Sequence, residues 1–293
     1  MSKMSRLNLH CRRAFLIALL TCSKSVSGTT ISVIVVPRGI VIAADGKTIQ
    51  YTENERVPPV GRVSKKLRVV GHRMVVGSYG VAKIGSDPHP AYYLGSFFDD
   101  IGKEVGVKTT VSEAAKIIKE RAALAMSGFN LLMSSGTVTR DTFVRETGHD
   151  NPLAGFVVAG YESGHPILFK VEVEIDWSTP RLRQPTITLL YPSATTEFSS
   201  DAERVCPLLP AWERCRIPKT GTAIQVTEIR ARAIVDLGIE INGSNVGLPI
   251  TSVTLFPNGA YRIRRYRSRL PDLCMIAQKI QRNQTRRDLP VGG

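Results

Sequence analysis

Runs of hydrophobic residues separated by turn signals predict strands in the first third of the chain. Residues 29–36 are rich in Thr, Ile and Val, Pro37-Arg38-Gly39 supplies a turn, and residues 40–44 form a second apolar run. Two such runs around a turn predict a β-hairpin. Residues 67–70 and 74–77 repeat the pattern and predict a second pair of strands.

Apolar residues with helical spacing follow these strands. One apolar face is formed by Leu94, Phe97, Phe98 and Ile101. This spacing predicts a helix, which we expect to begin with Asp87 as its cap and Pro88 at its first position. Thr110 and Glu113 have the spacing of a capping box and predict the start of a second helix. Residues 225–237 predict a third helix.

The rest of the pattern consists of further strands and one irregular segment. The expected strands are residues 156–159, 167–173, 187–191, 251–256 and 260–263, and residues 176–186 are expected to be irregular. Helices grouped between runs of strands are typical of an α+β fold in which sheets pack face to face with helical layers outside. Because no internal repeat or linker is evident, we expect one domain over residues 29–261.

The first 28 residues have the pattern of a leader, either a signal peptide or a propeptide. A basic, acid-free start precedes the apolar run at residues 14–21, and small residues at 25–28 provide a cleavage site. A signal peptide would place the mature protein in the periplasm or outside the cell. The alternatives are a buried helix start or a disordered basic tail in a cytoplasmic protein, or a lipoprotein with lipidated Cys22.

Positive charge is concentrated at both ends of the chain. The formal net charge is +14, and the 28-residue leader accounts for five of these charges without any acid. Residues 262–293 carry nine Lys or Arg and two Asp, so the rest is nearly neutral. A basic C-terminal extension can contact nucleic acid or an anionic membrane. It lacks the interleaved aromatics of a single-strand binder, so we favour a solvated extension and expect no nucleic-acid partner.

Cysteine and histidine give no sign of a metal centre. Cys206 and Cys215 flank a proline-containing loop and can pair in an oxidising compartment, while Cys274 would then stay free. The five histidines are scattered along the chain. We therefore expect neither a metal ion nor another cofactor. No stretch reaches the eighteen or more apolar residues of a membrane-spanning helix.

The pair Thr29-Thr30, directly after Gly28, is the feature with the clearest chemical meaning. A threonine hydroxyl inside a chain is a poor nucleophile. If the chain is cut before the threonine, the freed α-amine has an ordinary pKa of about 7.7–8.0 and can take the hydroxyl proton. Such a pair is a known form of nucleophilic catalysis.

The first third of the chain resembles the N-terminal nucleophile hydrolases, and among them the proteasome β-subunit and its bacterial relatives. The matching features are Thr29, Thr30, Gly39 in the turn and Ala44-Asp45 at the end of the second strand. The sixteen-residue step from Thr29 to Asp45 matches the family and selects Thr29 as the nucleophile. The resemblance implies a four-layer αββα sandwich of two antiparallel sheets, a threonine hydrolase acting on peptide or other amide bonds, and an oligomer.

Two further residues match the family's motifs. Lys66 in Ser64-Lys65-Lys66-Leu67 stands where the family has its lysine, and Gly77 stands near the end of the fourth expected strand. A positive Lys66 near Thr29 would lower the pKa values of its amine and hydroxyl, and Asp45 would orient that lysine. The N–H of Gly77 would donate to the oxyanion. We expect Lys66 to lie outside the core.

The sequence departs from the family further on. Active relatives have an Asp, and three residues later a Ser, after the last long helix; here these positions are Asn242 and Asn245. Asn can still hydrogen-bond an amine but brings no negative charge. Ser193 is the nearest match to the family's remaining serine. These changes keep open a non-catalytic protein that retains the fold, as in the proteasome α-type subunits.

Overall fold

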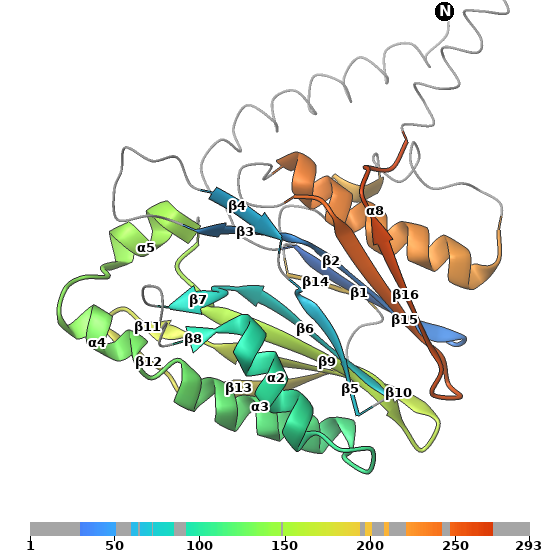
Figure 1. Cartoon of the computed structure of the whole chain (residues 1–293), viewed down its shortest axis with the longest axis horizontal. Coiled ribbons are helices and arrows are strands. Elements are labelled where there is room, and N and C mark those ends of the chain that lie inside the picture. The colour runs from blue at the N-terminus through green and yellow to red at the C-terminus, as the bar shows by residue number, and fades with distance from the viewer. Residues whose placement is uncertain are drawn as a thin grey trace, which may run out of the picture.

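Two antiparallel sheets form the centre of the protein (Figure 1). The computed structural model describes residues 30–50, 60–63, 65–71, 73–84, 92–147, 149–193, 197–200, 208–210, 221–241 and 247–271. The first sheet has the spatial order β14 (Glu197–Ser199), β1 (Ile31–Val36), β2 (Gly39–Asp45), β15 (Ile250–Leu255) and β16 (Tyr261–Tyr266). Both expected hairpins of this sheet, β1–β2 and β15–β16, are confirmed.

The second sheet is antiparallel throughout as well. Its spatial order is β13 (Thr186–Tyr191), β10 (His165–Val173), β9 (Ala154–Glu162), β6 (Met74–Gly80) and β5 (Leu67–Val70). The strands expected from the apolar runs are therefore present. The long central strands β6 and β9 are almost wholly buried, as their continuous apolar sequence requires.

Helices cover the outer faces of the two sheets (Figure 1). The helices α2 (Leu94–Glu104) and α3 (Val111–Ala125) lie on the second sheet, where α3 contacts β9 and β10. The helix α8 (Ala223–Ile241) lies on the first sheet and contacts β1, β2 and β15. The expected α+β class, with two antiparallel sheets between helical layers, is confirmed.

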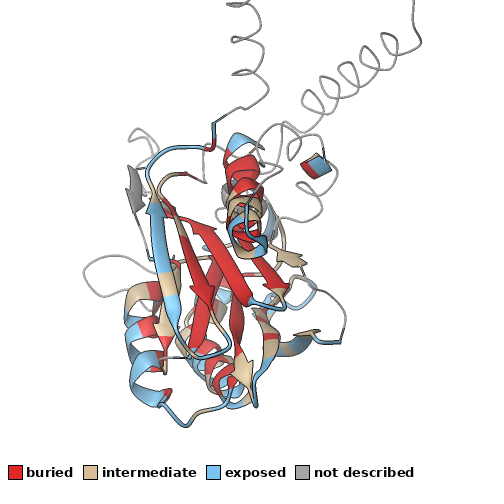
Figure 2. Ribbon diagram, turned by 90° about the vertical axis from the view of Figure 1, so that its right-hand side faces the viewer, coloured by how far each residue is buried: buried red, intermediate tan, exposed pale blue. Residues whose placement is uncertain are grey.

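Three apolar clusters hold these four layers together. Figure 2 shows in red the buried residues along the strands and helices of these layers. One cluster lies between α2, α3 and the second sheet, and includes Phe97, Phe98 and Phe156. A second lies between the sheets, where residues such as Ile31 and Val157 meet. The third lies between α8 and the first sheet. Burial of this apolar surface is the main force that stabilises the layered arrangement.

The starts of the first two helices show how well local signals predict an element. The capping box of α3 is present: the Thr110 side chain accepts from the Glu113 N–H, and the Glu113 side chain accepts from the Thr110 N–H. The expected start of α2 is wrong, because the helix begins at Leu94, after the short strand β8 (Tyr92–Tyr93). Its expected apolar face is nevertheless buried. Asp87 and Pro88 lie outside the described residues.

Several short elements have no clear signal in the sequence. They are the helices α4 (Phe129–Ser134) and α5 (Arg140–Thr147) and the strand pairs β3 (Lys47–Gln50) with β4 (Val60–Val63), β7 (Lys83–Ile84) with β8, and β11 (Ile175–Asp176) with β12 (Arg181–Leu182).

Within the described residues, no helix combines the length and the apolar character needed to cross a bilayer.

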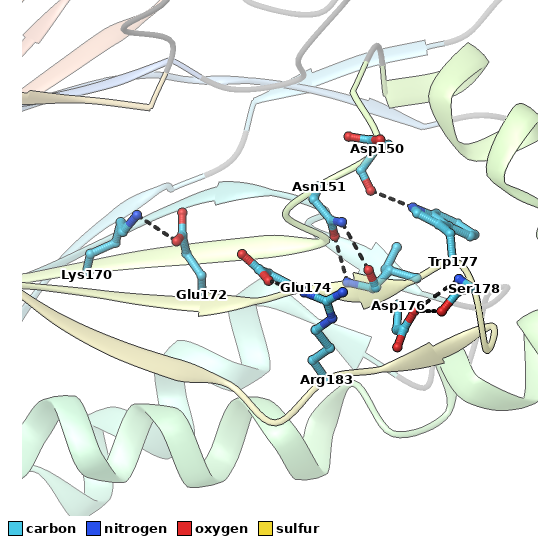
Figure 3. A network of polar contacts seen from close by, with 10 residues as sticks. Asp150, Asn151, Lys170, Glu172, Glu174, Asp176, Trp177, Ser178 and Arg183 are labelled. Carbon is cyan, nitrogen blue, oxygen red and sulfur yellow. Dashed lines mark hydrogen bonds and ion pairs between the residues drawn. The ribbon is translucent and has the colours of Figure 1, made fainter.

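The segment expected to be irregular after residue 175 contains the β11–β12 hairpin, held by polar contacts (Figure 3). The Asn151 side chain donates to the Ile175 carbonyl and accepts from its N–H, at 3.0 and 2.7 Å. The Trp177 indole N–H donates to the Asp150 carbonyl at 2.8 Å. These bonds involve residues distant in sequence, which explains why no local pattern predicted the hairpin.

The first sheet also extends beyond the expected C-terminal boundary at residue 261. β16 continues to Tyr266, and the following residues lie against α8. The Arg269 Nε donates to the buried Asp236 carboxylate at 2.9 Å, and the Leu270 N–H donates to it at 3.2 Å. The part of the basic extension that directly follows the hairpin is therefore integral to the domain.

Candidate functional site

A buried ion pair joins the ends of the two sheets. Asp45 is the last residue of β2 in the first sheet, and Lys66 directly precedes β5 in the second. The Lys66 Nζ lies 2.9 Å from Asp45 Oδ1 and 3.0 Å from Oδ2. Their side chains are 2% and 0% exposed. The expected partnership of the two residues is thus present, but the expectation that Lys66 lies outside the core is wrong.

Backbone contacts fix this pair in place. The Thr30 N–H donates to Asp45 Oδ1 at 3.0 Å, and the Gly247 N–H donates to Oδ2 at 3.3 Å. The Ser78 N–H in β6 donates to the Lys66 carbonyl at 2.9 Å. The Asp45 carboxylate therefore binds three groups: Thr30, which precedes β1, Gly247, which lies three residues before β15, and Lys66.

Burial and pairing act in opposite directions on the two charges. Desolvation raises the pKa of Asp45 and lowers the pKa of Lys66, since burial disfavours the charged form of each group. The opposite charge of each partner and the hydrogen bonds between them oppose these shifts. A lysine whose pKa is lowered in this way is more easily deprotonated than a surface lysine.

Thr30 presents its backbone to the site and its side chain to α8. Its side chain is fully buried, and its Oγ1 has no hydrogen-bond partner among the described residues. The side chain packs against Gly238 of α8. A hydroxyl enclosed in this way cannot approach a substrate carbonyl. The arrangement agrees with the selection of the preceding residue, Thr29, over Thr30; Thr29 itself lies outside the described residues.

Gly77 has a structural role that differs from the expected one. It lies inside β6, opposite Leu67 of β5 and Val157 of β9. An added Cβ would lie 2.2 Å from the Ile31 Cδ1 and 2.9 Å from side-chain atoms of both strand partners. Because the Ser78 N–H points toward β5, strand alternation directs the Gly77 N–H toward β9. Gly77 therefore permits the sheets to pack closely and is a poor oxyanion donor.

Gly80, at the end of β6, has the features that Gly77 lacks. Its N–H points to the same side as that of Ser78, because alternate N–H groups along a strand share a direction. On that side, the Ser78 N–H donates to the carbonyl of Lys66, the residue that precedes β5. Gly80 also has a φ of 83°, which favours glycine. The positive φ marks a strand end, which the sequence alone did not locate.

The structure separates Ser193 from the ion pair. Ser193 follows β13, the edge strand farthest from β5, and its hydroxyl donates to the Leu189 carbonyl at 2.6 Å. The strand register sets the end of β13 level with Val75, whereas Lys66 is level with Ser78. Ser193 thus lies at the opposite edge and toward the opposite end of the sheet, and its expected place in the site is wrong.

Ser200, which the sequence interpretation missed, lies beside the start of β1. Its Oγ accepts from the Ile31 N–H at 3.0 Å, and its own N–H donates to the Ile31 carbonyl at 3.0 Å. It directly follows β14, whose pairing with β1 brings it there. The Ser199-Ser200 pair was visible in the sequence, but only the long-range pairing of β14 with β1 shows that Ser200 lies next to Ile31.

Other expected residues lie outside the described part of the chain. They are Asn242 and Asn245, the 28-residue leader, and Cys206, Cys215 and Cys274. The segment that holds both asparagines ends directly before Gly247, whose N–H binds Asp45. In the parts that the structure describes, no group of three or more His, Cys, Asp or Glu residues could hold a metal ion.

Comparisons with known proteins support the architecture. No family model matches the sequence, and no curated protein matches it. Among solved structures, the (Gly-1) mutant of Anbu from Hyphomicrobium sp. strain MC1 is similar with a TM-score of 0.51 and 16% identity, over 91% of this chain and 99% of that one. Anbu (ancestral beta-subunit) from Yersinia bercovieri has a TM-score of 0.51 and 15% identity, over 90% and 98%. The chain has a proteasome-like fold.

Proposed function

We propose that the protein is a threonine hydrolase that cleaves peptide or other amide bonds with Thr29 as an N-terminal nucleophile. The observation that carries this proposal is the buried Asp45–Lys66 pair, whose carboxylate also binds the N–H of Thr30. Burying two charges is costly unless they serve each other or the reaction. Here they are fixed to the residue that directly follows the proposed nucleophile.

The reaction begins with removal of residues 1–28, by a signal peptidase or by autocatalysis. The freed Thr29 amine takes the proton of its hydroxyl while the oxygen attacks the amide carbonyl. Collapse of the tetrahedral intermediate breaks the C–N bond, and the amine returns the proton to the leaving nitrogen. Water then attacks the ester, with the same amine as base, and restores Thr29.

Lys66 favours the reactive form of the nucleophile. Its positive charge lowers the pKa of a nearby amine, so that a larger fraction is unprotonated and able to act as a base. Asp45 holds Lys66 in this role through two contacts. The N–H of Gly80 is the proposed oxyanion donor, and such a donor contributes about 2.7–4 kcal/mol to transition-state stabilisation when it is well placed.

A mechanism-based reagent tests this function without knowledge of the natural substrate. A peptide β-lactone acylates a nucleophilic threonine: the hydroxyl oxygen attacks the lactone carbonyl, the ring C–O bond breaks, and the proton passes to the ring oxygen. The protein mass then rises by the whole mass of the reagent. We expect this adduct on the hydroxyl of residue 29 in the mature protein and in the variant Thr29→Ser, and no adduct at residue 29 in Thr29→Ala.

The variants are expressed without residues 1–28, behind a removable N-terminal fusion, so that processing does not limit the result. Peptide mapping locates the adduct. If the wild type and Thr29→Ala were acylated to the same extent, at one and the same residue other than 29, the role of Thr29 would be refuted. Absence of acylation from the mature wild-type protein across reagents with different peptide parts would favour the alternative below.

The alternative is a non-catalytic protein that retains the fold. Asn242 and Asn245 favour it, since they replace the carboxylate and hydroxyl that active proteasome-like relatives have at the matching positions. The buried Asp45–Lys66 pair opposes it, because a well-packed apolar pair would stabilise the same position at least as well.

A further inference from the structure

The helix α8 approaches the start of β1 unusually closely at Gly238. A Cβ placed on Gly238 would lie 2.3 Å from the Thr30 Oγ1, 2.8 Å from its Cγ2 and 2.9 Å from its Cβ. Contacts this short between non-bonded atoms are sterically forbidden. Only glycine at residue 238 therefore allows the helix backbone and the Thr30 side chain to occupy their present positions.

Glycine is an unfavourable choice for a helix interior, where alanine is the best residue. Gly238 lies three residues before the end of α8, in a buried stretch that includes Leu237 and Ile239. Alanine at this position would favour the helix more than glycine does. The close packing on Thr30 is the physical reason for glycine here, because it leaves no space for a Cβ.

The helix cannot readily move away from Thr30, because it is anchored two residues earlier. The fully buried Asp236 carboxylate accepts hydrogen bonds from Arg269 and from the Leu270 N–H, at 2.9 and 3.2 Å. A larger side chain at residue 238 would therefore displace Thr30 rather than α8.

Thr30 transmits such a displacement directly to the site. Its N–H donates to the Asp45 carboxylate at 3.0 Å, and its carbonyl accepts from the Asp45 N–H at 3.2 Å. Thr29 precedes it by one peptide bond. A shift of Thr30 thus changes the position of Thr29, the proposed nucleophile. It also changes the contact between the Thr30 N–H and Asp45.

We propose that Gly238 is a positioning residue of the hydrolase: it lets α8 press on Thr30 and thereby sets the position of Thr29 relative to Asp45 and Lys66. This inference rests on the proposed function. It assigns to α8, which contributes no reacting group of its own among the described residues, a direct part in the alignment of the nucleophile.

A double-mutant cycle tests the inference. Gly238→Ala, Thr30→Ala and the double variant are compared with the mature wild-type protein for the rate of acylation by the β-lactone and for Tm. Gly102→Ala is the matched control, since a Cβ on this helical glycine of α2 would come no closer than 3.6 Å to the Arg68 side chain. Gly102→Ala should react at the wild-type rate.

We expect Gly238→Ala to lower the acylation rate by about 100-fold, the loss that a misplacement of about 1 Å can cause at a reacting centre. Thr30→Ala removes the two shortest of the three clashes and should restore much of this rate in the double variant. The acylation rate is measured well below the Tm of every variant, so that a loss of rate and its rescue report the position of Thr29 and not unfolding.

The results separate the failure of this inference from failure of the proposed function. If the wild type is acylated and Gly238→Ala reacts equally fast, or if Thr30→Ala gives no rescue, the inference is overturned. If the wild type is not acylated at all, the hydrolase proposal fails. The packing itself is then judged by Tm, where additive effects of the two substitutions would contradict the contact.

Discussion

At the scale of single residues, the Asp45 carboxylate is the point at which structure and proposed chemistry coincide. It pairs with Lys66 and accepts the N–H groups of Thr30 and Gly247. All of these contacts are buried. Substitutions at the pair should therefore change both the free energy of unfolding and the reactivity of the site, and the two effects can be measured separately.

Lys66→Met should destabilise the fold by about 3–5 kcal/mol, because it leaves the Asp45 charge buried without its partner. The double variant Asp45→Asn/Lys66→Met should recover part of this loss, since Asn has no charge. Its single oxygen keeps an acceptor for only one of the two N–H groups, which bind different oxygens of Asp45. Urea unfolding gives the stabilities. Neither variant should be acylated at the wild-type rate, and a single variant as stable as the wild type would contradict the account.

Gly77→Ala should destabilise the protein by about 1–3 kcal/mol, the usual cost of overpacking a core. The shortest clash of the new methyl group is with the Ile31 Cδ1, at 2.2 Å. Ile31→Val removes that atom, so the double variant should be more stable than the sum of the two single effects predicts. Equal stability of Gly77→Ala and the wild type in chemical unfolding would show that the sheets can separate at little cost.

The resemblance to a known family was sufficient to predict the partnership of Asp45 and Lys66, because both match that family's motifs at the ends of clearly patterned strands. It was not sufficient for Ser193 or Ser200. Their positions depend on which strand lies at which edge and on the register across a sheet. Likewise, the sequence pattern marks a glycine but does not tell the interior of a strand, at Gly77, from its end, at Gly80.

At the scale of elements, the helices show where local patterns suffice. α3 begins at its capping box, since all groups of that motif are local. α4 and α5 escaped prediction because they are short and are stabilised by contacts with distant segments, such as the bond from the Leu182 N–H to the Asn130 side chain. The residues after β16 escaped as well, because their partner Asp236 is distant in sequence.

A pair of truncations tests the contribution of the segment after β16. A chain that ends after Tyr266 loses Arg269 and Leu270 and leaves the buried Asp236 without them, which should cost about 3–5 kcal/mol relative to a chain that ends after Pro271. Urea unfolding of the two chains isolates this segment from the rest of the extension. Asp236→Asn in the shorter chain should reduce the difference in the free energy of unfolding between the two chains. Equal stability of the two chains would show that the segment does not stabilise the domain.

At the scale of the whole molecule, the candidate site depends on the packing of the two sheets. Thr30 and Asp45 belong to the first sheet, and Lys66 belongs to the second, so the ion pair forms only when the sandwich is complete. The α+β class was predictable from the order of the patterned segments. The crossovers that place β14 beside β1 and β15 beside β2 were not, because they join segments far apart in the sequence.

The central claim is that the mature chain begins at Thr29, with a free amine on the nucleophile. The direct test is the intact mass and N-terminal sequence of the purified protein, expressed from the full 293-residue chain. The account predicts a mature protein that starts at Thr29. An intact leader, or a start at Cys22 or Ser23, would contradict it, because the Thr29 amine would then remain within a peptide bond.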